Sequence, residues 1–266
     1  MAMFYRELAR NRKQVLIWML VLTLSSILIL AMYPSIAEQA DQYNEIMKSS
    51  PKAMISGLGA QNLDFGRVLD FFAYIVPYLV LAVAIFAMLL GAGMLAKEEE
   101  EKTIEFLLAK PVTRAEIITA KYAAALFYLL LFNVVLTVAN YLAIEVVRGK
   151  SAYSLKAFLL ISTGAFLVQW TFLSLGFFLS VFVVRSKVLT SLSLGVVFGF
   201  YFVSIASAVS EKLADLKYVT PFQYVNAANI IRDERLDGVY LLIMFAVIVL
   251  MTIGTYVAYQ RKDIKG

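Results

Sequence analysis

The 266-residue sequence contains no cysteine and no histidine, and only 16% of its residues are charged. The absence of cysteine excludes a disulfide framework and thiolate metal sites. The absence of histidine excludes the remaining usual zinc sites, Ser-His and Cys-His nucleophile pairs, and haem bound through histidine. These absences argue against most kinds of membrane enzyme, so we expect a chain without catalysis of its own.

Hydrophobic residues make up 61% of the chain, whereas about half is usual in soluble proteins. They are gathered into six runs without Asp, Glu, Lys or Arg, and a helix needs about 20 apolar residues to cross a membrane. The runs are continuously apolar, which favours helices over the alternating strands of a barrel. The sequence therefore predicts an all-α integral membrane protein with one transmembrane domain over residues 1–266 and six spans, at about 15–32, 71–96, 122–144, 157–184, 188–209 and 239–259.

The distribution of basic residues predicts the orientation of these spans. Six spans place both termini on one side of the membrane, and 14 of the 24 Lys and Arg residues fall on that side. Basic loops favour the cytoplasm, and the cluster before the first span usually dominates. We therefore expect both termini in the cytoplasm. Because the basic residues flank spans rather than form a binding stripe, we expect no nucleic-acid partner.

The segment before the first span has the pattern of an N-terminal amphipathic helix. Arg6, Arg10 and Lys13 share one helical face, and Phe4 and Leu8 lie roughly opposite. Such a helix can lie along the inner leaflet with its bases on lipid phosphates. The alternative is a frayed basic segment that only sets orientation.

Polar side chains occur inside two spans. Asn133, Thr137 and Asn140 share one helical face in the third span, and Gln169 lies in the fourth. They should not face lipid, so they either line a translocation path or bond neighbouring helices, which is the commoner arrangement. No ionisable residue lies in the middle of a span, so an ion-coupled transporter would have no visible relay.

Two features of the fifth span and the segment after it also carry alternatives. Gly195 and Gly199 are four residues apart, a spacing that lets helix backbones approach closely, either within the chain or between two copies. Residues 210–238 follow this span and are aromatic around Pro221. They predict either a re-entrant or interfacial helical element or an ordinary capped loop.

The charged loop at residues 97–121 contains signals for two helix starts. Four glutamates precede a helix over about Thr103–Lys110, and negative charge favours a helix N-terminus. Pro111 ends that helix. Thr113 and Glu116 then have the spacing of a capping box, which predicts a second helix start that leads into the third span.

The first of these loop helices would have two different faces. Ile104, Leu107 and Leu108 share one face, which can pack on the protein's own helices, while Glu105 and Phe106 point elsewhere. This geometry suits the docking of a cytoplasmic partner. The alternative is a solvated charge run with a locally buried Phe.

The loop also resembles a known pattern. It reads Glu98-x-x-Glu101-Lys-Thr-Ile-Glu105-Phe-Leu-Leu-Ala-Lys-Pro111-Val-Thr-Arg114. This resembles the loop of the permease subunits of ATP-binding-cassette exporters of the second export type, the ABC-2-type permease family. The six spans, the basic N-terminal helix and the Pro-Phe-containing last outer loop are similar to that family too. Lys102 departs from the pattern, since the family often carries Gly or Arg there.

The resemblance implies a non-catalytic permease subunit of an ATP-driven exporter. A cytoplasmic coupling helix, about Thr103–Lys110, would dock on a separate ABC ATPase present in two copies, which would bind the ATP and Mg²⁺ while this chain binds no cofactor directly. The alternative class is an energy-independent membrane scaffold or sensor that recruits a partner through the acidic loop. The resemblance assigns the ATPase coupling to Glu98, Glu101, Thr103, Glu105, Phe106, Leu107, Pro111 and Arg114.

The family further implies a second permease subunit, in a homodimer or heterodimer surrounded by membrane lipid. The first and fifth spans would form the interface, which gives Gly195 and Gly199 a possible place there. Pro221 and Phe222 would belong to an outer gate. The implied location is a cell membrane, specifically the plasma membrane of a prokaryote.

An ATPase within the same chain is excluded by its motifs. Gly149-Lys150-Ser151 resembles the end of a phosphate-binding loop, but Ile144 occupies the position of its first glycine. ATP hydrolysis must therefore come from another polypeptide.

Overall fold

The computed structural model of the chain describes residues 2–100, 113–183 and 185–262. Within these ranges all regular structure is helical, and six helices are long and apolar enough to cross a membrane. This confirms the predicted all-α class and its six spans. The six are α1 (Ala2–Leu30), α5 (Val68–Glu100), α7 (Arg114–Val147), α8 (Leu155–Phe182), α9 (Ser186–Val209) and α11 (Gly238–Arg261).

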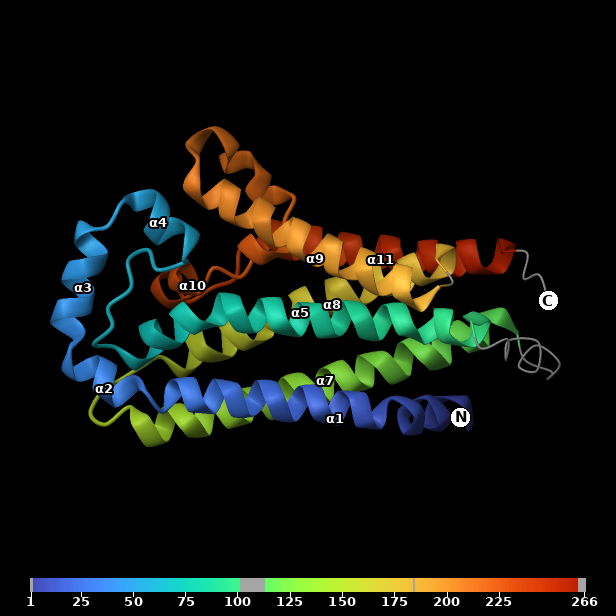
Figure 1. The fold of residues 1–266 in the computed structure, drawn as a ribbon, viewed down its shortest axis with the longest axis horizontal. Helices are drawn as coiled ribbons and strands as arrows, with labels where there is room; N and C mark the ends of the chain where they lie inside the picture. Colours follow the sequence, from blue (N-terminus) through green and yellow to red (C-terminus); the bar gives the residue numbers. More distant parts are fainter. Residues whose placement is uncertain (1, 101–112, 184, 263–266) are drawn as a thin grey trace.

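The long helices run side by side, with the N-terminus and C-terminus at the same end of the bundle (Figure 1). We call this the terminal end and the opposite one the distal end. The distal end carries the shorter elements: α2 (Tyr33–Glu38), α3 (Ala40–Ser49), α4 (Lys52–Gly57), the 3-10 helices η1 (Glu211–Tyr218) and η2 (Pro221–Gln223), and α10 (Ala227–Asp233).

Two helices extend beyond the apolar runs at the terminal end. The backbone of α5 stays helical to Glu100, because Lys and Glu are good helix formers and neither Gly nor Pro interrupts them. The third span begins early, at Arg114, because the capping box is present. Thr113 Oγ1 accepts from the Glu116 amide at 3.2 Å, and Glu116 Oε2 accepts from the Thr113 amide at 2.7 Å. The predicted second helix start is confirmed.

The N-terminal amphipathic helix is present, but it is not separate from the first span. Both belong to α1, which continues without a break from Ala2 to Leu30. Glu7, Asn11 and Val15 are buried at four-residue spacing, and α1 packs mainly against α7. The N-terminal segment therefore packs against α7 along one face. It neither lies alone on the inner leaflet nor forms a frayed segment, the two arrangements that the sequence predicts.

Two glycines allow α5 and α8 to pack with their backbones close together. A Cβ added at Gly91 would lie 2.3 Å from the Leu173 carbonyl oxygen, and one at Gly176 would lie 2.3 Å from the Met88 carbonyl oxygen. Each glycine thus lets the other helix's backbone approach where no side chain fits. The two helices form the buried centre of the bundle.

The segment between α9 and α11 folds back onto the bundle. It forms η1, η2 and α10, and α10 packs against α5 and α8. Val225, Ala227 and Ile230 are buried there, and Val225 lies against Gly164 of α8, where a Cβ would come within 2.9 Å. The segment is therefore a packed helical element rather than an ordinary capped loop.

Candidate functional site

The predicted ATPase-coupling loop connects α5 to α7, and the end of α5 and the start of α7 both lie at the terminal end of the bundle (Figure 1). Most of its residues lie outside the described part of the chain, and of Glu98 only the backbone, in α5, is described. Arg114 is the predicted coupling residue whose side chain can be placed. The residues outside the described ranges are Glu101, Thr103, Glu105, Phe106, Leu107 and Pro111.

Arg114 bonds the first turn of α7 to the last turn of α11. Carbonyls at a helix C-terminus lack partners within the helix, and positive charge is favourable there. One turn further along α7, the hydroxyls of Thr119 and Tyr256 lie 2.7 Å apart. Arg114 Nη1 donates to three carbonyl oxygens, at 3.0, 3.1 and 2.7 Å, those of Tyr259, Gln260 and Lys262.

A buried ion pair joins the same part of α7 to α1. Lys121 Nζ lies 2.9 Å from Glu7 Oε1, and the two side chains are 0% and 4% exposed. Asn11 Nδ2 donates to the Glu7 carbonyl oxygen at 3.0 Å and lies 3.7 Å from Met94 Sδ in α5. Charges removed from water cost several kcal/mol unless they are paired. The start of α7 is therefore bonded both to α1 and to α11.

The sequence reasoning did not find this ion pair. The sequence indicates this ion pair only weakly. Glu7 and Asn11 lie on the same helical face as Val15, but only if the N-terminal helix continues into the first span. In the sequence, Lys121 is one of the basic residues that flank a span, and nothing near it in the chain indicates a buried partner.

The four polar residues predicted inside the spans come together between α5, α7 and α8. Asn133, Thr137, Asn140 and Gln169 all line one small cavity of about 30 Å³. This volume holds a water molecule but no larger cargo. Their role as a translocation path stays a prediction, and the observed contacts are bonds between helices.

The amide groups around this cavity differ in how they are satisfied. Asn133 Nδ2 donates to the Ser162 carbonyl oxygen at 3.3 Å, and Asn140 Oδ1 accepts from Ser26. Gln169 Oε1 is buried and has no partner among the described residues. A buried polar atom of this kind is usually satisfied by ordered water.

Gly195 and Gly199 lie on an exposed face of α9. A Cβ added at either would meet no atom of this chain within 4 Å. They therefore make no close helix contact among the described residues, unlike Gly91 and Gly176. A dimer interface at this face stays a prediction.

Pro221 and Phe222 form the start of η2 at the distal end. Pro221 is buried, and the Phe222 ring lies 5.2 Å from the Phe172 ring of α8 and 5.6 Å from the Tyr201 ring of α9. Thr220 Oγ1 donates to the Phe200 carbonyl oxygen at 2.8 Å. The segment is thus wedged between two spans, and its role as a gate stays a prediction.

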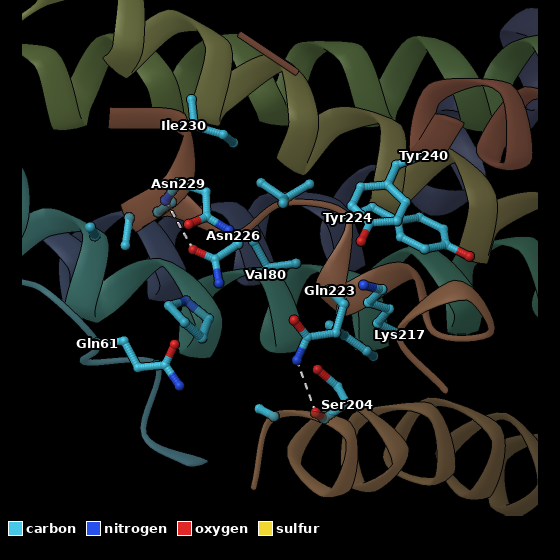
Figure 2. Close-up of a pocket in the computed structure, with 18 of the residues that line it drawn as sticks. Gln61, Val80, Ser204, Lys217, Gln223, Tyr224, Asn226, Asn229, Ile230 and Tyr240 are labelled. Atoms are coloured by element: carbon cyan, nitrogen blue, oxygen red, sulfur yellow. Dashed lines mark hydrogen bonds between the residues drawn. The ribbon is translucent and has the colours of Figure 1, made fainter. Parts of the chain in front are cut away.

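A cavity of about 660 Å³ lies at the distal end, between α4, α5, α9 and the η1–η2–α10 segment. Figure 2 shows Gln61, Asn226 and Asn229 on one side of it, with Lys217 and Tyr240 on the other. This size is typical of small-molecule sites. The sequence analysis did not predict this cavity. The carboxamide residues Gln223, Asn226 and Asn229, which follow Pro221, could have indicated a polar site there.

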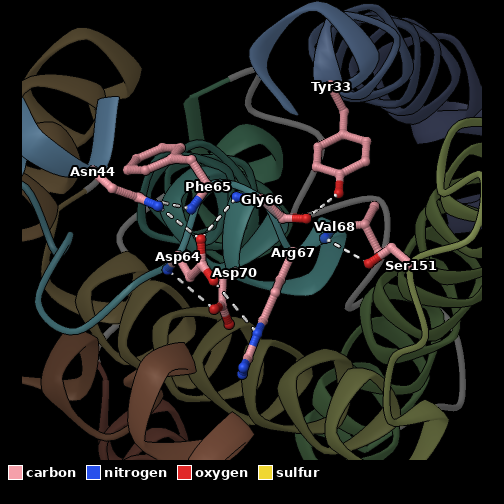
Figure 3. Close-up of polar contacts among 9 residues, drawn as sticks. All are labelled: Tyr33, Asn44, Asp64, Phe65, Gly66, Arg67, Val68, Asp70 and Ser151. Carbon is pink, nitrogen blue, oxygen red and sulfur yellow. Dashed lines mark hydrogen bonds and ion pairs between the residues drawn. The ribbon is translucent and has the colours of Figure 1, made fainter. Parts of the chain in front are cut away.

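The start of α5 is held to α3 by a polar cluster (Figure 3). Asp64 Oδ1 accepts from Asn44 Nδ2 at 2.8 Å and from the Gly66 amide at 3.0 Å. These bonds, with smaller help from Arg67, hold the pKa of the Asp64 carboxyl below its usual value. On the other side of α5, Tyr33 donates to the Gly66 carbonyl oxygen at 2.8 Å.

This cluster should lose its bonds in acid. A lowered pKa means that the stabilisation is fully present above the ordinary value of 3.8 and is lost as the pH falls through the lower folded value. Below about pH 4 we therefore expect faster amide hydrogen exchange in α3 and around Gly66, measured by mass spectrometry. The Asp64→Asn variant should exchange fast already at pH 7 and change little in acid. Equal pH dependence in both proteins would contradict this assignment.

The six long apolar helices define a multi-pass helical membrane protein. The sequence matches the family model described as "ABC-2 family transporter protein" over residues 1–264. The chain therefore belongs to the ABC-2 transporter family of membrane permeases, whose members are generally non-catalytic subunits and work with an ABC ATPase. No curated protein matches the chain.

Proposed function

We propose that the chain is the transmembrane subunit of an ATP-driven exporter, coupled through residues 97–121 to a separate cytoplasmic ATPase. The observation that supports this most is the anchoring of α7 where the loop ends. Arg114 bonds α7 to α11, and Lys121 bonds it to α1. A displacement of the loop would therefore move three spans together, which is what conversion of ATPase closure into helix motion requires.

In this proposal the ATPase is present in two copies and binds ATP and Mg²⁺, while the permease binds no cofactor directly. Both termini and the coupling loop face the cytoplasm, and the membrane is the plasma membrane of a prokaryote. The end of α5 and the start of α7, which flank the loop, lie at the same end of the bundle as the start of α1 and the end of α11, and this supports the arrangement (Figure 1). The acidic and aromatic pair Glu105 and Phe106 would contact the ATPase.

The permease would function as a dimer, homomeric or heteromeric, through α1 and α9. Both helices expose large apolar side chains, among them Leu20 and Phe202, and both are mostly unburied within one chain. Gly195 and Gly199 leave room on α9 for a partner helix. Phe222, wedged between α8 and α9, would form part of the outer gate of each subunit.

The decisive experiment removes the proposed docking side chains. The tagged chain is purified from native membranes, the co-purifying Walker-motif ATPase is identified, and the complex is reconstituted in proteoliposomes. We expect Glu105→Ala/Phe106→Ala to abolish the permease-dependent part of ATP hydrolysis, at least about a tenfold loss, because charged and aromatic anchors dominate such interfaces. Membrane insertion and elution volume should stay unchanged.

The matched control lies at the distal end. Glu45 and Ile46 on α3 are likewise an acid followed by a large apolar residue, and both are exposed. Glu45→Ala/Ile46→Ala should leave ATPase stimulation intact. If the loop variant still stimulates ATP hydrolysis fully, the proposed docking site is wrong. If no ATPase co-purifies with the permease, the energy-independent scaffold is favoured.

A further inference from the structure

The wall of the distal cavity of about 660 Å³ contains carboxamide side chains, and hydrogen bonds to the protein orient two of them. Gln223 Nε2 donates to the Ser204 carbonyl oxygen at 2.9 Å, which leaves its Oε1 for the cavity (Figure 2). Asn226 Oδ1 accepts from the Asn229 amide at 3.1 Å, which leaves its Nδ2. The wall thus presents both a fixed acceptor and fixed donors, the pattern that recognises hydroxyl groups.

The charges of the cavity determine the sign of its ligand. Four of its lining residues are charged at neutral pH, two basic and two acidic. Asp233 is bound by Arg232 through two contacts, at 2.9 and 3.1 Å, and this pairing lowers the pKa of Asp233. Asp237 Oδ1 accepts from the Val239 amide at 2.8 Å as the cap of α11. Both acids are therefore already engaged.

The two basic residues of the cavity, Lys217 and Arg235, take part in no ion pair among the described residues. Lys217 extends from η1 toward the cavity beside Gln223 and Tyr240 (Figure 2). Arg232 and Arg235 both lower the pKa of Asp233, and with Lys217 they make three cations against the two carboxylates of Asp233 and Asp237, which gives the site a positive excess. An anionic group is favoured there, and Lys is an effective binder of phosphate as a point charge.

We propose that this cavity binds a hydroxyl-bearing phosphate ester, with Lys217 and Arg235 on the phosphate and the carboxamides of Gln223, Asn226 and Asn229 on the hydroxyls. The chemistry is shared by an anionic glycerophospholipid and by a water-soluble glycerol phosphate. Binding needs no ATPase, so the proposal stands or falls separately from the proposed export function.

The test measures dissociation constants of the full-length protein in detergent micelles by native mass spectrometry or thermophoresis. The probes are phosphatidylglycerol, phosphatidic acid without the head-group hydroxyls, zwitterionic phosphatidylcholine, and free glycerol phosphate. We expect phosphatidylglycerol to bind most tightly, and Lys217→Gln to weaken it about tenfold, the effect of one charge-assisted hydrogen bond. Asn229→Ala should reduce the preference over phosphatidic acid.

A matched control is available on the same 3-10 helix. Lys212 is exposed and does not line the cavity, so Lys212→Gln removes the same charge without touching the site. It should bind like the unmodified protein. Comparable affinity for free glycerol phosphate would identify a soluble source of the group, whereas a requirement for the diacyl form would identify lipid.

Three results would overturn the proposal. Equal affinity for phosphatidylcholine would remove the anion requirement, and equal affinity for phosphatidic acid would remove the hydroxyl requirement. Equal weakening by Lys217→Gln and Lys212→Gln would show only general charge attraction. Elution volume and melting temperature of each variant establish that it is folded, and Arg235→Gln provides a second removal of charge from the site.

Discussion

Replacement of Gly91 with leucine is expected to prevent the bundle from assembling. An added Cβ would lie 2.3 Å from the Leu173 carbonyl oxygen and 3.1 Å from the Phe177 amide nitrogen, so the obstacle is backbone rather than a side chain that can rotate away. Even one extra methylene in a tight core costs about 1–3 kcal/mol, and here α5 and α8 would have to separate. We expect a loss of at least about 3 kcal/mol.

The measurement is the yield of monodisperse protein on size exclusion and its melting temperature. Gly176→Leu should behave in the same way, because its Cβ would lie 2.3 Å from the Met88 carbonyl oxygen and 2.9 Å from the Ala92 amide nitrogen. Gly91→Ala should already lower the melting temperature. Monodisperse Gly91→Leu protein with unchanged melting would contradict the close approach of the two helices.

The control uses the other pair of helix glycines. Gly195→Leu adds the same side chain on α9 where nothing of this chain lies within 4 Å, so a single subunit should fold as before. The variant also reports on the proposed dimer. If α9 forms the subunit interface, Gly195→Leu should shift the protein from dimers toward monomers. Gly91→Leu should instead yield little or no folded protein of either kind.

The glycines show which features could be predicted from the sequence and which could not. The six spans and the Thr113–Glu116 capping box depend on residues near each other in the chain, and both predictions are confirmed. The spacing of Gly195 and Gly199 predicts a close helix contact within the chain or between two copies; within the described part of the chain these two glycines make none, whereas Gly91 and Gly176 do. These lie on different helices, so their pairing follows only from the tertiary arrangement.

The candidate sites divide in the same way. The grouping of Asn133 with Asn140 followed from helical periodicity, but the approach of Gln169 to them needed the packing of α8 on α7. The distal cavity combines residues from α4 to α11, and its lining residues Gln61 and Lys217 are far apart in sequence. Periodicity within one helix carries no information about such convergence. The coupling motif, in contrast, is contiguous and could be identified by resemblance.

Replacement of Lys121 with methionine should strongly destabilise the terminal end of the bundle. The Glu7 carboxylate, on a side chain 4% exposed, would lose its partner 2.9 Å away and remain between α1 and α7. Removal of one member of a buried ion pair costs about 3–5 kcal/mol because the other charge stays buried. We expect a clear fall in melting temperature and faster hydrogen exchange in the first three turns of α1.

The double variant Glu7→Leu/Lys121→Met separates this explanation from a simple loss of packing. Two apolar residues of similar size leave no unpaired charge at this contact, so the double variant should recover most of the stability. Lys13→Met, on an exposed position of α1, should have little effect. A double variant no more stable than Lys121→Met would contradict the assignment.

The same double variant also tests force transmission. It restores packing but removes the ion pair between α7 and α1, whereas Arg114 still bonds α7 to α11 and Tyr128 still donates to the Leu8 carbonyl oxygen of α1. If the ion pair serves only stability, the double variant should transport normally once folded. If it carries motion from the loop to α1, ATP hydrolysis should remain stimulated while transport per ATP falls. The ratio of flux to hydrolysis in proteoliposomes therefore decides between an anchor and a transmission element.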